Sequence, residues 1–560
     1  MLTTEKCFLL VSVVLTFNGV IADTTTCGVA TKGPCGPSNQ QCGKPFGQTS
    51  PQYHVHSLSC SMNDPNGPVY DPVHGLYHMF YQDHLAEPRE GSGTGPVWGH
   101  AVSRDLTKWA RLPVAIWNDK PYDSGAIYTG SATVVNGKVV QIYPGICRNK
   151  DFDNCITGTN FNIAYPANES DPFYTEWTKP SFNPVVNNTQ RDPSTAWKTP
   201  YGEWRLTSFD TTSYASKDFV NWYSIGKQPG FSAGECPSFF KLPRTVRVGD
   251  AKRQDSQILP THVHKFSLQD GRRDWMQVGT WRDGTPGNPG KWTKIGDKSI
   301  IDSGNFYASK DFYDPVKNRR INFGWAVVSP GSTLSLGREV VYNVDLQQLE
   351  FAPLEEQKSL RSIQLANVSK TDVLEGWEFM SRGWGPGAGR QIEIVASFSL
   401  QSILKAPSMF GVVALTGEQK SNTNGVYFYL NITTDTIDCM QMKAGGGSDG
   451  NNNICNIFVG ALKQGQRGPS NPLFSDTLRI SPAEDSIELR VFVDQTFHEA
   501  YWQNGRVAMT VNNPQQAAAL QYDGVALRKD FGEAKLEFLR IFQVDSIWIS
   551  KAELLDEMKK

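Results

Sequence analysis

The distribution of apolar residues between about residues 51 and 355 restricts the fold most strongly. This region consists of short apolar or aromatic runs broken by Gly, Asn, Asp and Pro, such as Gly75–Tyr81 and Ser131–Val135. The second run is followed by Asn136-Gly137, a strong signal for a two-residue β-hairpin. No apolar stripe of three helical turns occurs here, so the pattern predicts short strands and turns.

A weak internal repeat indicates how these strands are arranged. Ser103–Trp109 (SRDLTKW) resembles Ser216–Trp222 (SKDFVNW), and Ser309–Phe312 (SKDF) resembles both. The spacings are 113 and 93 residues, and a four-stranded propeller blade takes roughly 45–55 residues. Each spacing therefore fits two blades, and residues 51–355 are predicted to form a β-propeller of five or six blades.

The C-terminal part shows a different strand pattern. Residues 356–375 are charged and lose the strand pattern, which predicts a linker. In Ile487–Asp494 apolar residues alternate with mostly polar ones, as in a half-buried strand, and Gln391–Leu400 and Gly425–Thr433 also alternate. These runs predict a β-sandwich over residues 376–560, with a short helix in Lys551–Lys560.

The N-terminus resembles an export signal. Lys6 precedes the apolar run Phe8–Phe17, and small residues before Ala22 suit cleavage. A run of about ten residues is too short to span a bilayer. We therefore expect residues 1–22 to be a signal peptide and the mature protein to be extracellular, in the cell wall or in the vacuole, not in a membrane. Residues 23–50 read as a cysteine-rich leader.

The cysteines agree with an oxidising compartment. Of the ten, Cys7 lies in the signal, and close spacing predicts the pairs Cys147–Cys155 and Cys439–Cys455. Cys236 is left over. Four more cysteines can pair in three ways, and four Asn-x-Ser/Thr triplets are candidate glycosylation sites. These cysteines are Cys27, Cys35, Cys42 and Cys60, and the triplets begin at Asn168, Asn187, Asn367 and Asn431.

Net charge excludes some classes of partner. The formal net charge is −2 at pH 7, so no basic field is available to hold nucleic acid or an anionic membrane. Charge gives no indication of the substrate or of the oligomeric state.

Three carboxylates lie in distinctive local sequences: Asp64 in MNDPNG, Asp192 in RDP and Glu235 in GECP. A propeller brings the inner strands of all its blades to one axis, where carboxylates distant in sequence can meet. Glycosyl transfer needs such a meeting, because one carboxylate attacks or stabilises the anomeric carbon and another protonates the leaving oxygen. We expect Asp64 to be ionised, through backbone donors of the Asn-Gly turn, and Glu235 to hold the proton.

These motifs together resemble glycoside hydrolase family 32, which contains invertases, inulinases, levanases, fructan exohydrolases and fructosyltransferases. Further similar segments extend the resemblance over about residues 51–550. They are Tyr77–Gln82, Trp98–Asp105, Tyr128–Ser131, Phe306–Lys310 and Leu489–Asp494, with Glu499 and Asn504-Gly505.

The resemblance implies a five-bladed propeller followed by a β-sandwich, sucrose or fructan as substrate, and no metal or cofactor. It implies a retaining reaction through a covalent fructosyl-enzyme, with Asp64 as nucleophile, Glu235 as acid/base and Asp192 stabilising the transition state. The two reacting carboxyls would then lie roughly 5–5.5 Å apart. Residues matching positions that contact the fructosyl unit are Asn63, Gln82, Thr129 and Arg191.

The chain departs from the family at its aromatic residues. Ser61 and Ala233-Gly234 stand where tryptophan is usual. Trp98 is the partial substitute for a tryptophan expected after Gln82, and we predict it as a fifth residue that contacts the substrate. An Asp and a Lys three residues apart accompany sucrose use in plant members; here Asp270 with Arg273, or Gln269 with Arg272, takes their place. The choice among sucrose, inulin and levan therefore stays open.

Two other functions stay open as well. A fructosyltransferase would share the covalent intermediate and pass the fructosyl group to a sugar instead of water. An inactive relative would bind fructans or an enzyme, as a lectin or an inhibitor.

Overall fold

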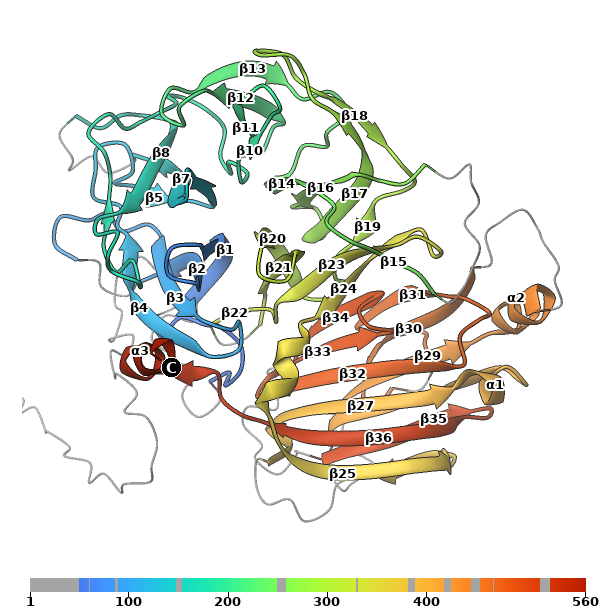
Figure 1. Ribbon diagram of the computed structural model, residues 1–560. Helices are drawn as coiled ribbons and strands as arrows, with labels where there is room; N and C mark the ends of the chain where they lie inside the picture. Colours follow the sequence, from blue (N-terminus) through green and yellow to red (C-terminus); the bar gives the residue numbers. More distant parts are fainter. Residues whose placement is uncertain are drawn as a thin grey trace, which may run out of the picture.

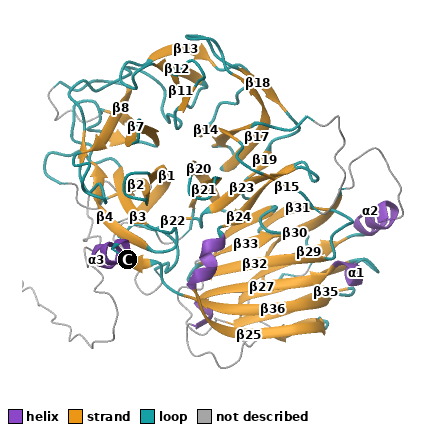
Figure 2. Cartoon of the chain, in the orientation of Figure 1, coloured by secondary structure: helices purple, strands orange, loops and turns teal. Residues whose placement is uncertain are grey.

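The computed structural model describes residues 50–59, 61–85, 89–147, 154–248, 258–328, 331–380, 388–416, 425–444, 454–466, 468–513 and 524–559. The predicted signal peptide and the leader lie outside these ranges, apart from residue 50, and so do Cys27, Cys35, Cys42 and Cys60. Nearly all regular structure in the described part is β-strand, as Figure 2 shows. None of the helices described is long and apolar enough to cross a membrane.

The strands between Ser61 and Pro353 form the five sheets of a β-propeller, arranged in a ring (Figure 1). The first sheet contains β1 (Ser61–Asp71), β2 (Leu76–His84), β3 (Val97–Ser103) and β4 (Trp109–Ile116). The second contains β5 (Ala126–Ile127), β6 (Ser131–Val135), β7 (Lys138–Ile146), β8 (Thr159–Pro166) and β9 (Trp177–Thr178). The third contains β10 (Trp197–Lys198), β11 (Trp204–Thr207), β12 (Thr212–Ser216) and β13 (Tyr223–Lys227).

Two further sheets complete the ring. The fourth contains β14 (Glu235–Lys241), β16 (His262–Leu268), β17 (Arg273–Arg282), β18 (Lys291–Lys294) and β19 (Ser299–Ile300). The fifth contains β15 (Thr245–Val246), β20 (Phe306–Asp314), β21 (Arg319–Ala326), β22 (Thr333–Leu334), β23 (Arg338–Asn343) and β24 (Gln348–Pro353). Figure 1 places β1, β14 and β20 near the centre of the ring and β4, β13 and β18 at its rim.

The internal repeat has a structural explanation. Its first two copies are the same turn, which joins the third and fourth strands of the first and third blades. In each copy the leading serine Oγ accepts from the amide of a residue with positive φ, Leu106 (67°) or Phe219 (67°). The tryptophan that closes each turn donates its indole N–H to the carbonyl of that same residue. The third copy lies within β20, so it belongs to another position and its spacing carries no information on blades.

The predicted hairpin is confirmed. Val135 pairs with Lys138 across Asn136 and Gly137, whose φ angles are 51° and 83°. Both turn residues are therefore left-handed, as a two-residue hairpin turn of this kind requires. The predicted disulfides Cys147–Cys155 and Cys439–Cys455 are also present, and Cys236 is a buried free thiol.

Two six-stranded antiparallel sheets form the sandwich. One has the order β25 (Arg361–Asp372), β36 (Lys535–Val544), β27 (Gln391–Ser399), β32 (Ser486–Asp494), β33 (Phe497–Trp502) and β34 (Val507–Asn512). The other has the order β26 (Gly376–Phe379), β35 (Gly524–Phe531), β28 (Ser408–Thr416), β29 (Val426–Ile432), β30 (Cys455–Lys463) and β31 (Phe474–Ile480).

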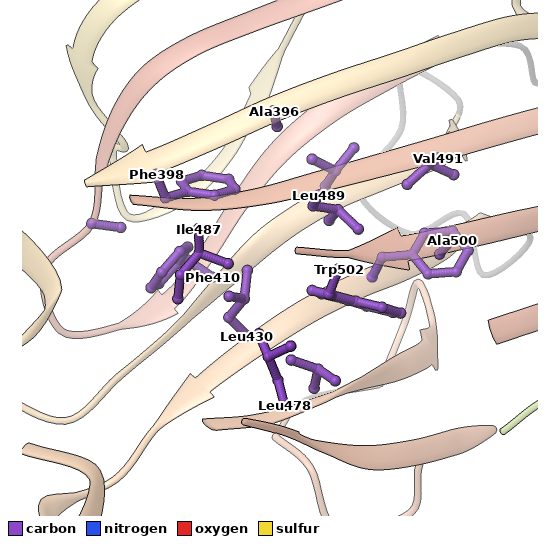
Figure 3. Close-up of a cluster of buried hydrophobic side chains, with 14 of the residues drawn as sticks. Ala396, Phe398, Phe410, Leu430, Leu478, Ile487, Leu489, Val491, Ala500 and Trp502 are labelled. Carbon is purple, nitrogen blue, oxygen red and sulfur yellow. The ribbon is translucent and has the colours of Figure 1, made fainter. Parts of the chain in front are cut away.

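Alternating side chains of these strands fill the core between the two sheets. Figure 3 shows Phe398, Leu489 and Trp502 in this cluster. Tyr501 and Trp502 are both buried, so they are structural and not an exposed sugar-binding surface. Short helical segments join the strands. They are the 3-10 turns η2 (Glu355–Leu360) and η3 (Ala388–Arg390) and the helices α1 (Leu400–Ile403) and α2 (Thr434–Ala444).

The structure differs from the sequence prediction at the linker. Residues 356–375 contain η2 and then the twelve-residue strand β25, an outer strand of the sandwich that pairs only with β36. Most of its residues are exposed or half-buried, so polar residues such as Asn367 and Ser369 are tolerated on it. An edge strand of this composition lacks the apolar alternation that identifies a strand in a sequence.

The C-terminus returns to the propeller. Strand β37 (Trp548–Ile549) pairs in parallel with β4, and helix α3 (Lys551–Met558) follows it, as the expected C-terminal helix. A capping box between Ser550 and Glu553 begins the helix. Leu554 of α3 is fully buried against residues of the first blade, including Leu76 and Val102. The chain thereby links the sandwich back to the first blade.

Candidate active site

A cavity of about 590 Å³ lies where the inner strands of the blades meet. All three candidate carboxylates line it, together with four of the five predicted contact residues. Its lining consists of Asn63, Asp64, Gln82, Tyr128, Thr129, Arg191, Asp192, Glu235, Gln269, Arg272, Tyr307 and Trp325. Carboxylates that are 171 positions apart in the sequence thus share one cavity, as the propeller hypothesis predicts.

Irregular backbone presents these side chains. Pairing of β1 with β2 shifts register between Met62 and Pro65, where Asn63 and Asp64 lie. Pairing of β14 with β16 shifts after Glu235, and Cys236 has a φ of 50°. A third shift follows Tyr307 on β20. Because β-bulges redirect side chains, these register shifts turn the residues away from regular strand pairing and toward the cavity.

Asp64 is held by side-chain donors. Asn63 Nδ2 donates to its Oδ1 at 3.0 Å, the Thr129 hydroxyl donates to its Oδ2, and the Cys236 thiol lies 3.5 Å from the same Oδ2. Gln82 completes the network, accepting from Asn63 at 3.2 Å and donating to Thr129 at 2.7 Å. The carboxylate therefore has a fixed orientation.

The expected electrostatics of Asp64 need correction. Burial raises the pKa of Asp64, and the nearby Glu235 charge raises it further. Opposing hydrogen bonds come from the Thr129, Asn63 and Cys236 side chains and not from backbone donors of the Asn-Gly turn. The charged form thus depends on these side chains, because the site is largely removed from water.

Glu235 accepts three hydrogen bonds. Arg191 Nη2 and Gln269 Nε2 donate to its Oε1 at 2.5 and 2.7 Å, and the Tyr307 hydroxyl donates to its Oε2 at 2.6 Å. Burial and the neighbouring Glu235 carboxylate raise the pKa of Tyr307, so Tyr307 stays protonated and remains a donor. Such a set of donors fits the carboxylate form of Glu235, which differs from the expectation that Glu235 holds the proton.

Asp192 is buried next to charged groups of both signs. Burial raises its pKa to about 7, and the Asp64 charge adds to this. The amide of Cys236, which donates to Asp192 Oδ2 at 3.0 Å, and the charges of Arg191 and Lys310 act in the opposite direction. Asp192 has a φ of 63°, so its backbone also adopts the left-handed region.

One predicted contact residue lies elsewhere. Trp98 is 0% exposed and packs with Phe80 and Tyr143 in a hydrophobic cluster. Its indole N–H donates to the carbonyl of Tyr128 at 3.1 Å, so it supports the Tyr128–Thr129 segment from behind and does not line the cavity. A tryptophan in a strand of a buried sheet needs a partner for its N–H, and here the backbone supplies it.

Five further residues line the cavity: Tyr128, Gln269, Arg272, Tyr307 and Trp325. Tyr128 and Tyr307 lie in segments that resemble the family, and Gln269 with Arg272 is one of the two alignments considered for the Asp/Lys pair. No feature of the sequence indicated that Trp325 would line the cavity. It lies on β21, with the Arg272 guanidinium 5.7 Å from its ring centroid, and these two residues form an aromatic and cationic wall.

Comparison with known proteins agrees with this architecture. The model of the glycosyl hydrolases family 32 N-terminal domain matches residues 54–333. A vacuolar acid beta-fructofuranosidase 2 of a Rosa hybrid cultivar is 30% identical over 522 residues, which cover 82% of this chain and 75% of that protein. An acid beta-fructofuranosidase of Vigna radiata var. radiata is 31% identical over 516 residues, covering 82% and 74%.

Solved structures share the fold. The crystal structure of fructan 1-exohydrolase IIa from Cichorium intybus superposes with a TM-score of 0.71 at 24% identity, over 90% of this chain and 99% of that one. Sucrose-6-phosphate hydrolase from Lactobacillus gasseri gives a TM-score of 0.64 at 19% identity, over 91% and 95%.

The chain therefore belongs to glycoside hydrolase family 32, with the propeller and sandwich of that family. Its relatives and its site together define the kind of enzyme: it is a glycoside hydrolase of the β-fructofuranosidase type.

Proposed function

We propose that the protein hydrolyses terminal β-fructofuranosyl bonds of sucrose or fructans with retention of configuration. The observation that carries the proposal is the shared cavity of Asp64, Asp192 and Glu235, in which each carboxylate has a different set of partners. Retaining glycosidases need two carboxylates in different roles on one sugar.

In the first step the Asp64 carboxylate attacks the anomeric carbon of the fructosyl unit. A bond forms between that carbon and Asp64, the glycosidic bond breaks, and Glu235 gives its proton to the leaving oxygen. In the second step water attacks the same carbon, Glu235 takes a proton from the water, and Asp64 leaves as a carboxylate. The three hydrogen-bond donors around Glu235 suit its carboxylate form, which is the form that takes a proton from water in this second step.

Asp192 binds hydroxyl groups of the fructosyl unit in this proposal and stabilises the oxocarbenium-like transition state. Asn63, Gln82 and Thr129 hold Asp64 and supply further polar contacts. In this proposal Arg272 and Trp325 face the leaving sugar, because they form an aromatic and cationic wall of the same cavity.

We also propose that the protein enters the secretory pathway. The apolar N-terminal run and the two disulfides support this, and relatives include proteins named as vacuolar or as insoluble isoenzymes. Three glycosylation triplets have an exposed asparagine, at Asn168, Asn187 and Asn367, whereas Asn431 is half-buried.

Product analysis on sucrose, inulin and levan side by side tests the proposed reaction. The proposal expects free fructose from at least one of them, released in step with the remaining glucose or shortened chain. Glucose in excess over fructose with longer oligosaccharides from concentrated sucrose would instead identify a transferase. Binding without turnover on all three would identify an inactive relative.

Stereochemistry tests the mechanism separately. In dilute methanol, retention yields the methyl β-fructofuranoside, because methanol attacks the covalent intermediate from the face that the leaving group occupied. The methyl α-fructofuranoside, detected by NMR, would contradict double displacement.

A further inference from the structure

Two buried lysines lie close to the segments that line the cavity, and within the described part of the chain only Lys265 has a carboxylate partner. Lys265 on β16 and Lys310 on β20 are 0% and 1% exposed. Lys265 Nζ lies 3.1 Å from Asp274 Oδ2 and donates to Ser267 Oγ at 2.7 Å and to the carbonyls of Ser309 and Cys236 at 2.6 and 3.2 Å. Its charge is therefore paired within the protein.

Lys310 has a different environment. Its Nζ lies 3.1 Å from Ser131 Oγ and 3.5 Å from the Pro237 carbonyl, and among the described residues no carboxylate oxygen lies within 4 Å of it. A buried ammonium without an ion-pair partner is costly. Packing alone would be satisfied by an apolar side chain of similar length, so the amine needs another explanation.

The partners of Lys310 belong to the segments that form the cavity. Ser131 Oγ, which accepts from Lys310, donates to the Pro193 carbonyl at 2.8 Å. Ser131 follows Thr129 by two residues, Pro193 follows Asp192 directly, and Pro237 follows Glu235 by two residues. One amine from the fifth blade therefore connects the second, third and fourth blades immediately behind their cavity-lining residues.

We propose that Lys310 is a positioning residue, whose ammonium holds the segments of Thr129, Asp192 and Glu235 in one arrangement and presents a fixed positive charge to Asp192. The inference rests on the proposed function for its effect on catalysis. It goes beyond that function by assigning a role to a residue that lies outside the cavity.

The charges around Lys310 support an effect of its ammonium on Asp192. Burial lowers the pKa of the Lys310 ammonium and the Lys265 charge lowers it further, whereas Cys236, Asp192 and Asp311 raise it. Asp311 is engaged by Arg320 and Lys265 by Asp274, so Asp192 is the carboxylate left to respond. The Lys310 charge lowers the pKa of Asp192, which burial raises to about 7. Without this charge the pKa of Asp192 would rise further.

The test combines Lys310→Met with Asp192→Asn in a double-mutant cycle. Turnover of Lys310→Met is measured at a pH where the variant is folded, and at least about a tenfold fall in kcat is expected, because misplacing reacting groups slightly costs this much or more. Turnover within twofold of wild type in a folded Lys310→Met variant would overturn the proposal.

The second measurement, unfolding free energy as a function of pH, isolates the effect of the Lys310 charge and does not require an active enzyme. A carboxyl group whose pKa is raised on folding contributes stability below its unfolded pKa and loses it as pH rises through the folded pKa. In wild type, the difference in unfolding free energy between Asp192 and Asp192→Asn should therefore change up to about pH 7. In the Lys310→Met background this change should extend to higher pH. An identical pH dependence in the two backgrounds would mean that the amine does not act on Asp192.

Lys265→Met is the control for charge, since it removes a neighbouring lysine of similar burial that also contacts the site, through the Cys236 carbonyl, but whose charge is paired with Asp274. It should leave the pH dependence of the Asp192 contribution to stability unchanged.

If Lys310→Met does not fold, Ser131→Ala serves as a second variant, because it keeps the Lys310 charge and removes its hydrogen-bond acceptor. It should lower kcat without changing that pH dependence, and an unchanged kcat would overturn the proposal. Should wild type act on no fructoside, the proposed function fails while the stability cycle still decides the coupling.

Discussion

At the scale of single residues, Asp64 shows how burial and hydrogen bonding oppose each other. Burial raises its pKa, whereas hydrogen bonds from Thr129, Asn63 and Cys236 favour its charged form. A nucleophile must be ionised before it attacks, so activity should be lost as pH falls through the pKa of Asp64. The Thr129 hydroxyl, which donates directly to Oδ2, has the largest opposing effect.

Thr129→Val should move the acid limb of the kcat/KM profile to higher pH. The substitution removes a donor to a charged carboxylate, an interaction typically worth about 1.5–3 kcal/mol, so kcat/KM on the acid side should fall roughly tenfold or more. The pH dependence of kcat/KM measures this. Thr129→Ser keeps the hydroxyl and serves as the control; an acid limb at the same pH in all three proteins would contradict the assignment.

The scale of strands and turns shows what a sequence can reveal. The Asn136-Gly137 hairpin and the alternation in Ile487–Asp494 were predictable, because a turn type and a period of two are local properties. The bulges at Asp64 and Glu235 were not, because a register shift depends on the partner strand. The motifs identified three carboxylates that share one cavity, whereas the burial of Trp98 and the wall at Trp325 depend on which strands face each other in three dimensions.

Helix α3 provides a prediction for one element. Leu554 is fully buried between the helix and the first blade, so Leu554→Ala should remove about 2–5 kcal/mol of stability from this contact. The C-terminal segment should then exchange its amide hydrogens faster, as followed by mass spectrometry. Lys559→Ala, at the exposed C-cap of the same helix, should change nothing. Equal protection of the segment in both variants would show that the contact does not hold α3.

At the scale of the whole molecule, a buried polar network joins the propeller to the sandwich. Arg338 of the fifth blade donates to Asp302 at 2.8 Å and to the Tyr501 hydroxyl of the sandwich at 3.0 Å. Thr510 of the sandwich donates to the same Asp302 carboxylate at 2.8 Å. Arg338 and Asp302 are both essentially inaccessible to water, and Glu499 lies 3.5 Å from the guanidinium. The two parts should therefore unfold together.

Arg338→Ala should destabilise the molecule by about 3–5 kcal/mol, since it leaves the buried Asp302 and Glu499 without their cation. Differential scanning calorimetry should show a lower transition temperature for both parts. Arg244→Ala removes an exposed ion pair with Glu339 and should cost less than about 1 kcal/mol. Similar losses in the two variants would argue against a coupling role for the buried network.

The central claim is that the carboxylate of Asp64 forms a bond with the fructosyl unit. Glu235→Ala with an activated fructoside tests it most directly, because a good leaving group needs no acid catalyst while removal of the base slows hydrolysis of the intermediate. Mass spectrometry of the intact protein and its peptides should find one added fructosyl residue on the peptide containing Asp64, and none in Asp64→Ala/Glu235→Ala. An adduct on another residue, or turnover in the double variant equal to that of Glu235→Ala, would contradict the account.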